Sequence, residues 1–441
     1  MAILHISEVE ADGLARRHLY GARIETPQAG IKNDTYGFDL VGWTVGKSGP
    51  VQSIEVSQEG ISIASTPLRI ERPDVESEFP GVSGARTSGF RISVGGLKLR
   101  TDFELTVHAR LDDGVRVRLA TIKGRRDAIR SAHEPLLNPL MINTIGRSGS
   151  TWLMWALGCH PQITSYEPFA HETRVASYWA TLLQELMDPN CYLTQFDPAD
   201  LAAPRWWLGD SGNHRPIVPD GALARWLGRE RVPALAAMAQ AQIDDFYIAN
   251  ADAGADVTYF VEKFSPWQML PDLLAEIYPR AQEIILVRDF RDMFCSIRAY
   301  NAKRGQQGFG RDGVATESEY IREIVRGFGL TLLRRWRAQP ERAYLLRYED
   351  LIAEPNGTLS KLLKHLDLDA GPATVEGTLA EASRRRSGSD GHRTAPDVAS
   401  SVGRWRRDLS PELLKVCEEA LDPVLDEFGY ERTSPHVAER A

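Results

Sequence analysis

The chain has 441 residues and a formal net charge of −8, and hydrophobic residues make up 43% of it. Because this length exceeds that of one ordinary domain, we expect two domains, each able to bury its own core. The net negative charge argues against a nucleic-acid-binding protein, since phosphate contacts need a basic face.

The first twelve residues contain acidic side chains and lack the apolar core of roughly 7 to 15 residues that marks a secretory signal. The sequence contains no apolar run of about 18 residues, so we expect no membrane span. The 4 cysteines lie far apart and form no Cys-x-x-Cys pair, and we therefore expect no metal. These features predict a soluble, cytoplasmic protein, of which the oligomeric state is not readable.

Short β-rich segments separated by turn signals occupy the N-terminal part of the chain, at residues 36–45, 51–56, 61–64, 89–94, 103–109 and 115–122. This pattern is typical of a small antiparallel β-sandwich, which we place over residues 20–126. Phe38 and Leu40, at strand spacing, are expected to face its core. The polar stretch 124–139 then predicts a linker.

Strands and helices alternate after the linker, with strands expected at 140–145, 163–165 and 257–262 and further strands beginning near residues 283 and 343. Such alternation predicts an α/β domain over residues 136–435, built on a doubly wound parallel sheet. In a sheet of this kind, ligands bind at the carboxyl ends of the strands.

The first strand of this domain runs into a turn that contains Gly146 and Gly149, and a helix follows. The two glycines let backbone N–H groups converge at the helix start, which favours a bound phosphate or sulfate. Arg147, Ser148, Ser150 and Thr151 add further donors to such an anion. The ATP-binding P-loop requires Gly-Lys where Ser150 and Thr151 stand, so a Walker-type NTPase is disfavoured. An ordinary turn with hydroxyl caps is the structural alternative.

The run Arg147-Ser148-Gly149-Ser150-Thr151-Trp152 resembles the phosphosulfate loop of sulfotransferases that use 3′-phosphoadenosine 5′-phosphosulfate (PAPS), of the bacterial and Golgi type. Three later segments resemble further family motifs in family order. They are Arg288 with Ser296 for the 3′-phosphate, Tyr348 in Tyr-Glu-Asp-Leu beside the nucleotide, and Val402-Gly403-Arg404 in the loop that closes over it. The resemblance implies a P-loop-like α/β fold, PAPS as co-substrate and PAP as product.

The resemblance also implies catalytic roles. Arg147 takes the place of the residue that stabilises the leaving group, and Lys263 resembles a lysine that contacts the sulfuryl group. Lys263 as a plain salt-bridge partner of Glu262 or of a neighbouring residue stays open. Glu167 stands where Glu-using members have their general base, and His171 is the second candidate for the base.

The acceptor is not readable from the sequence. Residues 172–256 form a long insertion rich in tryptophan, and the resemblance together with the sandwich favours a hydroxyl of a glycan or glycolipid. Two other functions stay open. One is a P-loop kinase or nucleotide hydrolase, and the other is a glycan-binding protein with an inactive sulfotransferase-like domain.

Overall fold

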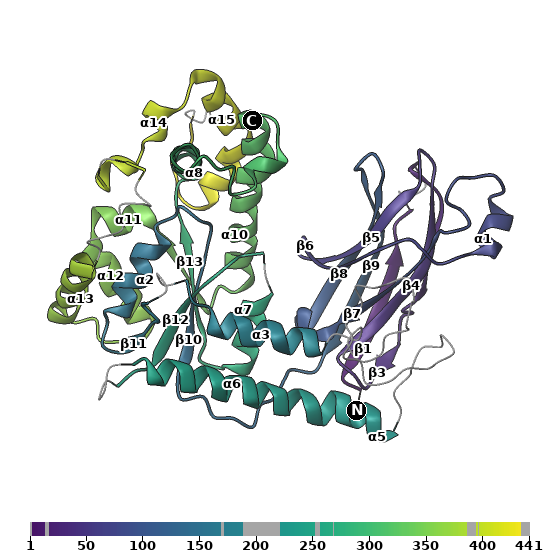
Figure 1. The fold of residues 1–441 in the computed structure, drawn as a ribbon, viewed down its shortest axis with the longest axis horizontal. Coiled ribbons are helices and arrows are strands. Elements are labelled where there is room, and N and C mark those ends of the chain that lie inside the picture. The colour runs from purple at the N-terminus through teal and green to yellow at the C-terminus, as the bar shows by residue number, and fades with distance from the viewer. Residues whose placement is uncertain are drawn as a thin grey trace, which may run out of the picture. The chain divides into compact units, whose positions relative to one another are not determined.

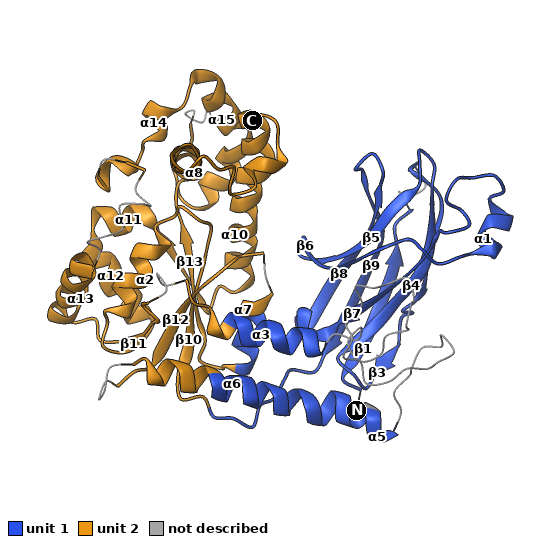
Figure 2. Cartoon of the chain, viewed as in Figure 1, with its two compact units in different colours: residues 1–134, 177–242, 272–277 blue, residues 135–176, 243–271, 278–441 orange. Residues whose placement is uncertain are grey.

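The computed structural model describes residues 2–13, 17–168, 172–187, 221–251, 256–267, 269–385, 394–395 and 397–433. Its residue contacts divide the chain into two compact units (Figure 2). Unit 1 comprises residues 1–134, 177–242 and 272–277, and unit 2 comprises residues 135–176, 243–271 and 278–441.

Unit 1 contains two antiparallel sheets. One has the strand order β3-β1-β9-β8-β5-β6 and the other the order β2-β4-β7. Their bounds are β1 Leu4–Ala11, β2 Leu19–Thr26, β3 Lys32–Asn33, β4 Gly37–Gly46, β5 Val51–Gln58, β6 Ile61–Pro67, β7 Gly89–Gly95, β8 Asp102–Leu111 and β9 Arg116–Arg126, with helix α1 at Pro73–Glu78 and a 3-10 turn, η2, at Gly96–Lys98.

The two sheets of unit 1 share one hydrophobic core, to which both contribute alternate side chains. Phe38 and Leu40 of β4 are buried in that core, as their strand spacing predicts. The sandwich also includes β1, which precedes residue 20 and pairs along the length of β9. This strand is hard to recognise in the sequence. Only Leu4 and Ile6 at its start are buried, and the glutamates that follow Ile6 are exposed.

Unit 2 is built on a five-stranded sheet with the order β11-β12-β10-β13-β14, and every pair in it is parallel (Figure 1). The strands are β10 Asn138–Thr144, β11 Ile163–Thr164, β12 Tyr259–Phe264, β13 Gln282–Val287 and β14 Ala343–Arg347. In chain order, this sheet starts with the central β10. The strands β11 and β12 are added on one side of it and β13 and β14 on the other, so the strand order reverses at β10. Ligands bind at such a reversal in open α/β sheets.

Helices and short helical turns account for much of the remaining described chain. They are α2 Ser150–Gly158, α3 Val175–Leu186, α5 Gly221–Arg225, η3 Trp226–Glu230, α6 Arg231–Ala249, α7 Leu270–Ile277, α8 Phe290–Arg304, η4 Arg311–Gly313, α9 Glu317–Glu319, η5 Tyr320–Val325, α10 Arg326–Ala338, α11 Tyr348–Ala353, α12 Pro355–His365, α13 Pro372–Arg385, η7 Ala399–Ser401, α14 Trp405–Asp408 and α15 Pro411–Glu427.

Hydrophobic clusters cover both faces of the parallel sheet. On one face, Ile284 and Leu286 of β13 pack with helices α2, α12 and α13. On the other face, Ile285 and Val287 of the same strand pack with helices α8, α10 and α15. This alternation is that of a strand buried on both sides, and it confirms the doubly wound α/β fold expected from the sequence.

A buried ion pair lies beneath the second of these faces. Glu283 of β13 accepts two bonds from Arg335 of α10, at 2.6 Å from Nε and 2.9 Å from Nη2, and a third from Asn143 Nδ2 of β10 at 2.7 Å. The Glu283 side chain has no exposed surface and that of Arg335 has 3%. The pair thus joins the two central strands to α10.

Truncating one partner leaves the other charge buried, so Glu283→Ala should lower the free energy of unfolding by about 3 to 5 kcal/mol, measured by urea denaturation. The double variant Glu283→Leu/Arg335→Met removes both charges and should recover much of that loss. If the double variant is less stable than Glu283→Ala, the pair is not the source of the effect.

Candidate functional site

The turn between β10 and α2 forms a backbone cradle, which we define as Ile145–Ser150. Two of its residues lie in the left-handed region, Arg147 with φ 75° and Gly149 with φ 84°. Within the described residues no side chain caps the start of α2, so its first N–H groups face the cradle. An N-terminus with this geometry attracts an anion.

Aromatic rings leave no space for a side chain at either glycine of the cradle. A Cβ atom on Gly149 would clash with the ring of Tyr348, and one on Gly146 would clash with the ring of Phe309. Tyr348 follows β14 and Phe309 lies in the segment after α8. The cradle therefore requires glycine at both positions for close approach, and at Gly149 also for the left-handed backbone conformation.

Arg288, directly after β13, connects three segments of the site. Its Nη1 donates to the carbonyl of Arg147 at 2.9 Å, and its Nη2 donates to the carbonyl of Ser401 at 2.6 Å. The guanidinium also lies 4.8 Å from the centre of the Tyr348 ring. Although Arg288 is only 5% exposed, none of the described residues accepts a bond from its Nε. A buried donor in that state suits an anion.

Arg147 and Ser296 meet on the same side of the cradle, with Nε of Arg147 donating to Oγ of Ser296 at 3.3 Å. The Ser296 hydroxyl also lies 3.0 Å from Oγ1 of Thr394, whose carbonyl accepts from Arg404 Nη1 at 3.1 Å. Burial lowers the pKa of Arg147, and the neighbouring cations of Arg288 and Arg404 lower it further. The structure thus brings together three arginines that the sequence places 257 residues apart or less, and an anion would relieve their mutual repulsion.

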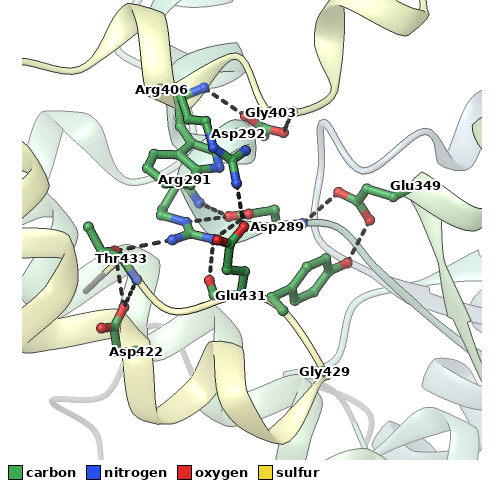
Figure 3. A network of polar contacts seen from close by, with 12 residues as sticks. Asp289, Arg291, Asp292, Glu349, Gly403, Arg406, Asp422, Gly429, Glu431 and Thr433 are labelled. Carbon is green, nitrogen blue, oxygen red and sulfur yellow. Dashed lines mark hydrogen bonds and ion pairs between the residues drawn. The ribbon is translucent and has the colours of Figure 1, made fainter. Parts of the chain in front are cut away.

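Asp292 tethers the loop that carries Arg404. Its carboxylate accepts from the backbone N–H of Gly403 at 2.6 Å and from that of Trp405 at 2.9 Å (Figure 3). Burial, followed by the charge of Asp289, raises the pKa of Asp292 to about 6. The left-handed Gly403, with φ 68°, turns the chain so that both N–H groups reach the one side chain.

A second part of the same network holds α8 in place (Figure 3). Arg291 binds both oxygens of Asp289, at 3.0 and 2.7 Å, and its ring-stacked guanidinium lies 3.9 Å from the centre of Trp405. Glu349 accepts from the Asp289 N–H at 3.0 Å and from the Tyr430 hydroxyl at 2.7 Å. Asp289 and Asp292 are therefore committed to structural contacts around the site.

Lys263, at the end of β12, reaches the other side of the cradle. Its Nζ lies 3.3 Å from Oγ1 of Thr151 and forms an ion pair with Glu172. Lys263 is 5% exposed, and burial lowers its pKa while the Glu172 carboxylate raises it in part. Glu172 also lies 3.5 Å from Arg174. Lys263, Glu172 and Ser150 line one cavity of about 730 Å³.

Glu167 lies in a different place. It forms an ion pair with Arg385 of α13 and lines a separate pocket with Cys159 and His160. His171 lies outside the described residues. Glu172 was not predicted from the sequence, although the charged run Glu172-Thr173-Arg174 directly before α3 is a signal for it.

The remaining predicted residues have more ordinary surroundings. Ser148 is 1% exposed and its hydroxyl faces Sδ of Met293 at 3.9 Å. Trp152 packs against the hydrophobic cluster beneath α2, and the side chain of Val402 is exposed. Within the described residues, the side chains of these three residues make no recorded contact with Arg147, Arg288 or Arg404.

Among the residues placed by the structure, no group of three or more His, Cys, Asp or Glu side chains is arranged to hold a metal ion. Nor does any helix of the described ranges combine the length and apolar character needed to cross a bilayer.

The raised pKa of Asp292 predicts a pH dependence of stability. The unfolded chain loses this proton near the ordinary value of 3.8, whereas the folded chain keeps it to about 6. The folded state thus binds more protons between these values, and the contribution of Asp292 to the free energy of unfolding falls as the pH rises from about 4 to about 6. Urea unfolding across this range should show the slope in the wild type and a flatter profile in Asp292→Asn. Identical slopes in the two proteins would contradict the assignment.

Comparison with known proteins agrees with this geometry. Residues 139–372 match the sulfotransferase family. A curated relative from Mycobacterium bovis, omega-hydroxy-beta-dihydromenaquinone-9 sulfotransferase Stf3, is 27% identical over 178 residues, which are 38% of this chain and 40% of the relative. The Mycobacterium tuberculosis protein of the same name matches equally. The chain therefore spans about two fifths of the length of the curated relatives it matches.

Solved structures that resemble the chain include the sulfotransferase domain from the curacin biosynthetic pathway, with a TM-score of 0.41 and 16% identity, covering 68% of this chain and all of that domain. Mouse sulfotransferase SULT7A1, complexed with PAP, has a TM-score of 0.37 and 11% identity, covering 67% of this chain and 85% of its own. The family match spans more than half of the chain and includes the cradle, Lys263, Arg288 and Tyr348. The chain belongs to the sulfotransferase family.

Proposed function

We propose that this chain transfers the sulfuryl group of PAPS to a hydroxyl group of an acceptor. One observation supports the proposal above all. The cradle, the arginines Arg147, Arg288 and Arg404, and the Lys263–Glu172 pair converge at the carboxyl ends of adjacent parallel strands. All of these residues belong to the domain that we propose at residues 136–435.

The residues present fit a nucleotide with phosphate groups at both its 3′ and 5′ positions. The cradle N–H groups suit the 5′-phosphosulfate, and the Tyr348 ring over Gly149 leaves no room there for a side chain. Arg288, Ser296 and Arg404 form a separate cationic group suited to the 3′-phosphate, with the Arg288 Nε left for an acceptor that the described chain does not supply.

Sulfuryl transfer requires two catalytic functions from the protein, stabilisation of the leaving group and removal of the acceptor proton. The acceptor oxygen attacks sulfur, the bond between sulfur and the bridging phosphate oxygen breaks, and PAP leaves with the extra negative charge. Lys263, held beside Thr151 at the start of α2, is suited to stabilise that charge. Arg147, which the sequence resemblance assigned to the leaving group, points its Nε toward Ser296 and so lies closer to the proposed 3′-phosphate group.

The second catalytic function is removal of the acceptor proton. Glu167 and His171 stay predictions for this role. We propose Glu172 instead, because it pairs with Lys263 and lines the cavity that reaches the cradle, whereas Glu167 pairs with Arg385 and lines another pocket. A carboxylate at this point can take the proton from a hydroxyl held in the cavity.

The glycan or glycolipid acceptor and the cytoplasmic location stay predictions. The mycobacterial relatives are named for an omega-hydroxy-dihydromenaquinone, which is a hydroxylated lipid and not a sugar. This name is consistent with a hydroxyl group as the acceptor, whether or not the acceptor is a sugar.

A paired substitution tests the base. Glu172→Gln should lower turnover by about two or more orders of magnitude, the usual effect of removing a positioned general base, and should leave PAP affinity nearly unchanged. The acidic limb of the pH–rate profile should vanish in this variant. Glu167→Gln is the matched control and should keep both turnover and the limb. Loss of turnover in Glu167→Gln with normal turnover in Glu172→Gln would return the role to Glu167.

A second substitution tests the 3′-phosphate group. Arg288→Ala should weaken PAP binding by about 2 to 4 kcal/mol in calorimetry, because it leaves a buried phosphate without its charged partner. Binding of adenosine 5′-phosphate, which lacks the 3′-phosphate, should change less. Arg337→Ala, which removes an exposed guanidinium from α10, serves as the control. If the wild type binds the two nucleotides equally, the assignment of Arg288 is wrong.

A further inference from the structure

The cavity beside the cradle has a wall that the proposed chemistry does not use. Phe264 is the last residue of β12 and Trp267 follows that strand, Phe309 follows α8, and Ile324 and Phe328 come from η5 and α10. These five side chains line the same cavity of about 730 Å³ as Lys263 and Glu172. The volume is that of a site for a small organic molecule.

Most polar groups of the lining are already engaged. The Thr144 hydroxyl donates to the carbonyl of Leu286 at 2.9 Å, and Arg174 pairs with Glu172, which itself pairs with Lys263. Ser150 belongs to the cradle. Ser265 and Glu323 are the further polar side chains of the lining, so the wall away from the cradle is largely hydrocarbon.

The aromatic wall is held in place by specific contacts. The ring of Trp267 lies 5.7 Å from that of Phe328, centre to centre, and the Trp267 side chain is 42% exposed. Phe309 has φ 62°, which is rare for a bulky residue, and the Tyr320 hydroxyl donates to its carbonyl at 2.7 Å. Such a strained position persists only where the surroundings impose it, and it often marks a functional site.

Burial of a sugar in this cavity would be costly. A sugar carries a hydroxyl on nearly every ring carbon, and each one buried without a partner costs about 1 to 3 kcal/mol. An acceptor with a hydrocarbon framework instead gains by burial against aromatic and aliphatic side chains. It needs polar partners for one hydroxyl only, and Glu172 and Lys263 stand where that hydroxyl must react.

We infer that the acceptor is an alcohol or phenol whose hydroxyl stands on a hydrocarbon framework, bound against the wall of Trp267, Phe309 and Phe328. This inference rests on the proposed function for the position of the reacting hydroxyl. It replaces the glycan with an apolar acceptor at the same site.

Gly327 offers a test that leaves the reacting groups in place. It lies on α10, lines the cavity, and has open space where a side chain would begin. Gly327→Leu should fill part of the cavity at no cost to the helix, since leucine is the better helix former. Gly377→Leu, on an exposed turn of α13 with equally open space, is the matched control.

The probes are 2-naphthol, 1-dodecanol and maltotriose, each titrated by calorimetry into the protein with saturating PAP and each assayed with PAPS by mass spectrometry. We expect binding and sulfation of 2-naphthol, 1-dodecanol or both, but not of maltotriose. Gly327→Leu should weaken the binding by about tenfold or more, and Gly377→Leu should leave it unchanged. Both variants should bind PAP as the wild type does.

The outcomes separate this inference from the proposed function. Binding and sulfation of maltotriose, with neither apolar probe bound, would overturn the apolar acceptor while supporting sulfuryl transfer. Equal binding of the apolar probes by Gly327→Leu and Gly377→Leu would also overturn it, because the probes would then lie elsewhere. Binding of an apolar probe that Gly327→Leu weakens, in a protein that does not bind PAP, would support the apolar site and contradict the proposed function.

Discussion

The bonds of one buried guanidinium hold the site together. Arg288 donates to the carbonyls of Arg147 and Ser401 and lies against the ring of Tyr348, so it joins the cradle, the C-terminal loop and the end of β14. A buried arginine needs acceptors for its N–H groups, and a charge without them costs several kcal/mol. Placing Arg288 at the end of β13 therefore fixes where three other segments lie. The parallel sheet makes this possible, because it brings the carboxyl ends of β10, β12, β13 and β14 to one edge.

The two sides of the cradle carry different chemistry. On one side, burial and the neighbouring cations of Arg288 and Arg404 lower the pKa of Arg147, and Asp292 keeps the Arg404 loop near them. On the other side Lys263 and Glu172 form a buried cation with an adjacent carboxylate, and both line the aromatic cavity. This separation suits a co-substrate held at one end by phosphate contacts and reacting at the other. Electrostatic preorganisation of this kind needs no movement of charged groups during the reaction.

The sequence was sufficient for the fold of unit 2, because that fold follows from local patterns, and the family resemblance pointed to the residues that we propose for the nucleotide. Buried strands such as β10 and β13 read as apolar runs, and Arg288 and Tyr348 directly follow strands whose ends must meet. The strand β1 was missed, since its exposed acidic residues mask a pattern that only pairing with β9 explains. Glu172 and Glu167 could not be ranked, because they are five residues apart and their partners, Lys263 and Arg385, lie 91 and 218 positions away. The role of Asp292 depends on a loop 111 residues downstream and has no local signal.

The cradle and the three arginines Arg147, Arg288 and Arg404 together form the proposed site for a nucleotide with 3′- and 5′-anionic groups. The most direct test is the melting temperature of the full chain in the presence of PAP, compared with that in ATP and Mg²⁺. A ligand that binds the native state raises the melting temperature according to its affinity. We predict a clear rise with micromolar PAP and little or none with ATP and Mg²⁺ at the same concentration. An equal or larger rise with ATP and Mg²⁺ would contradict this assignment and favour a nucleotide kinase or hydrolase.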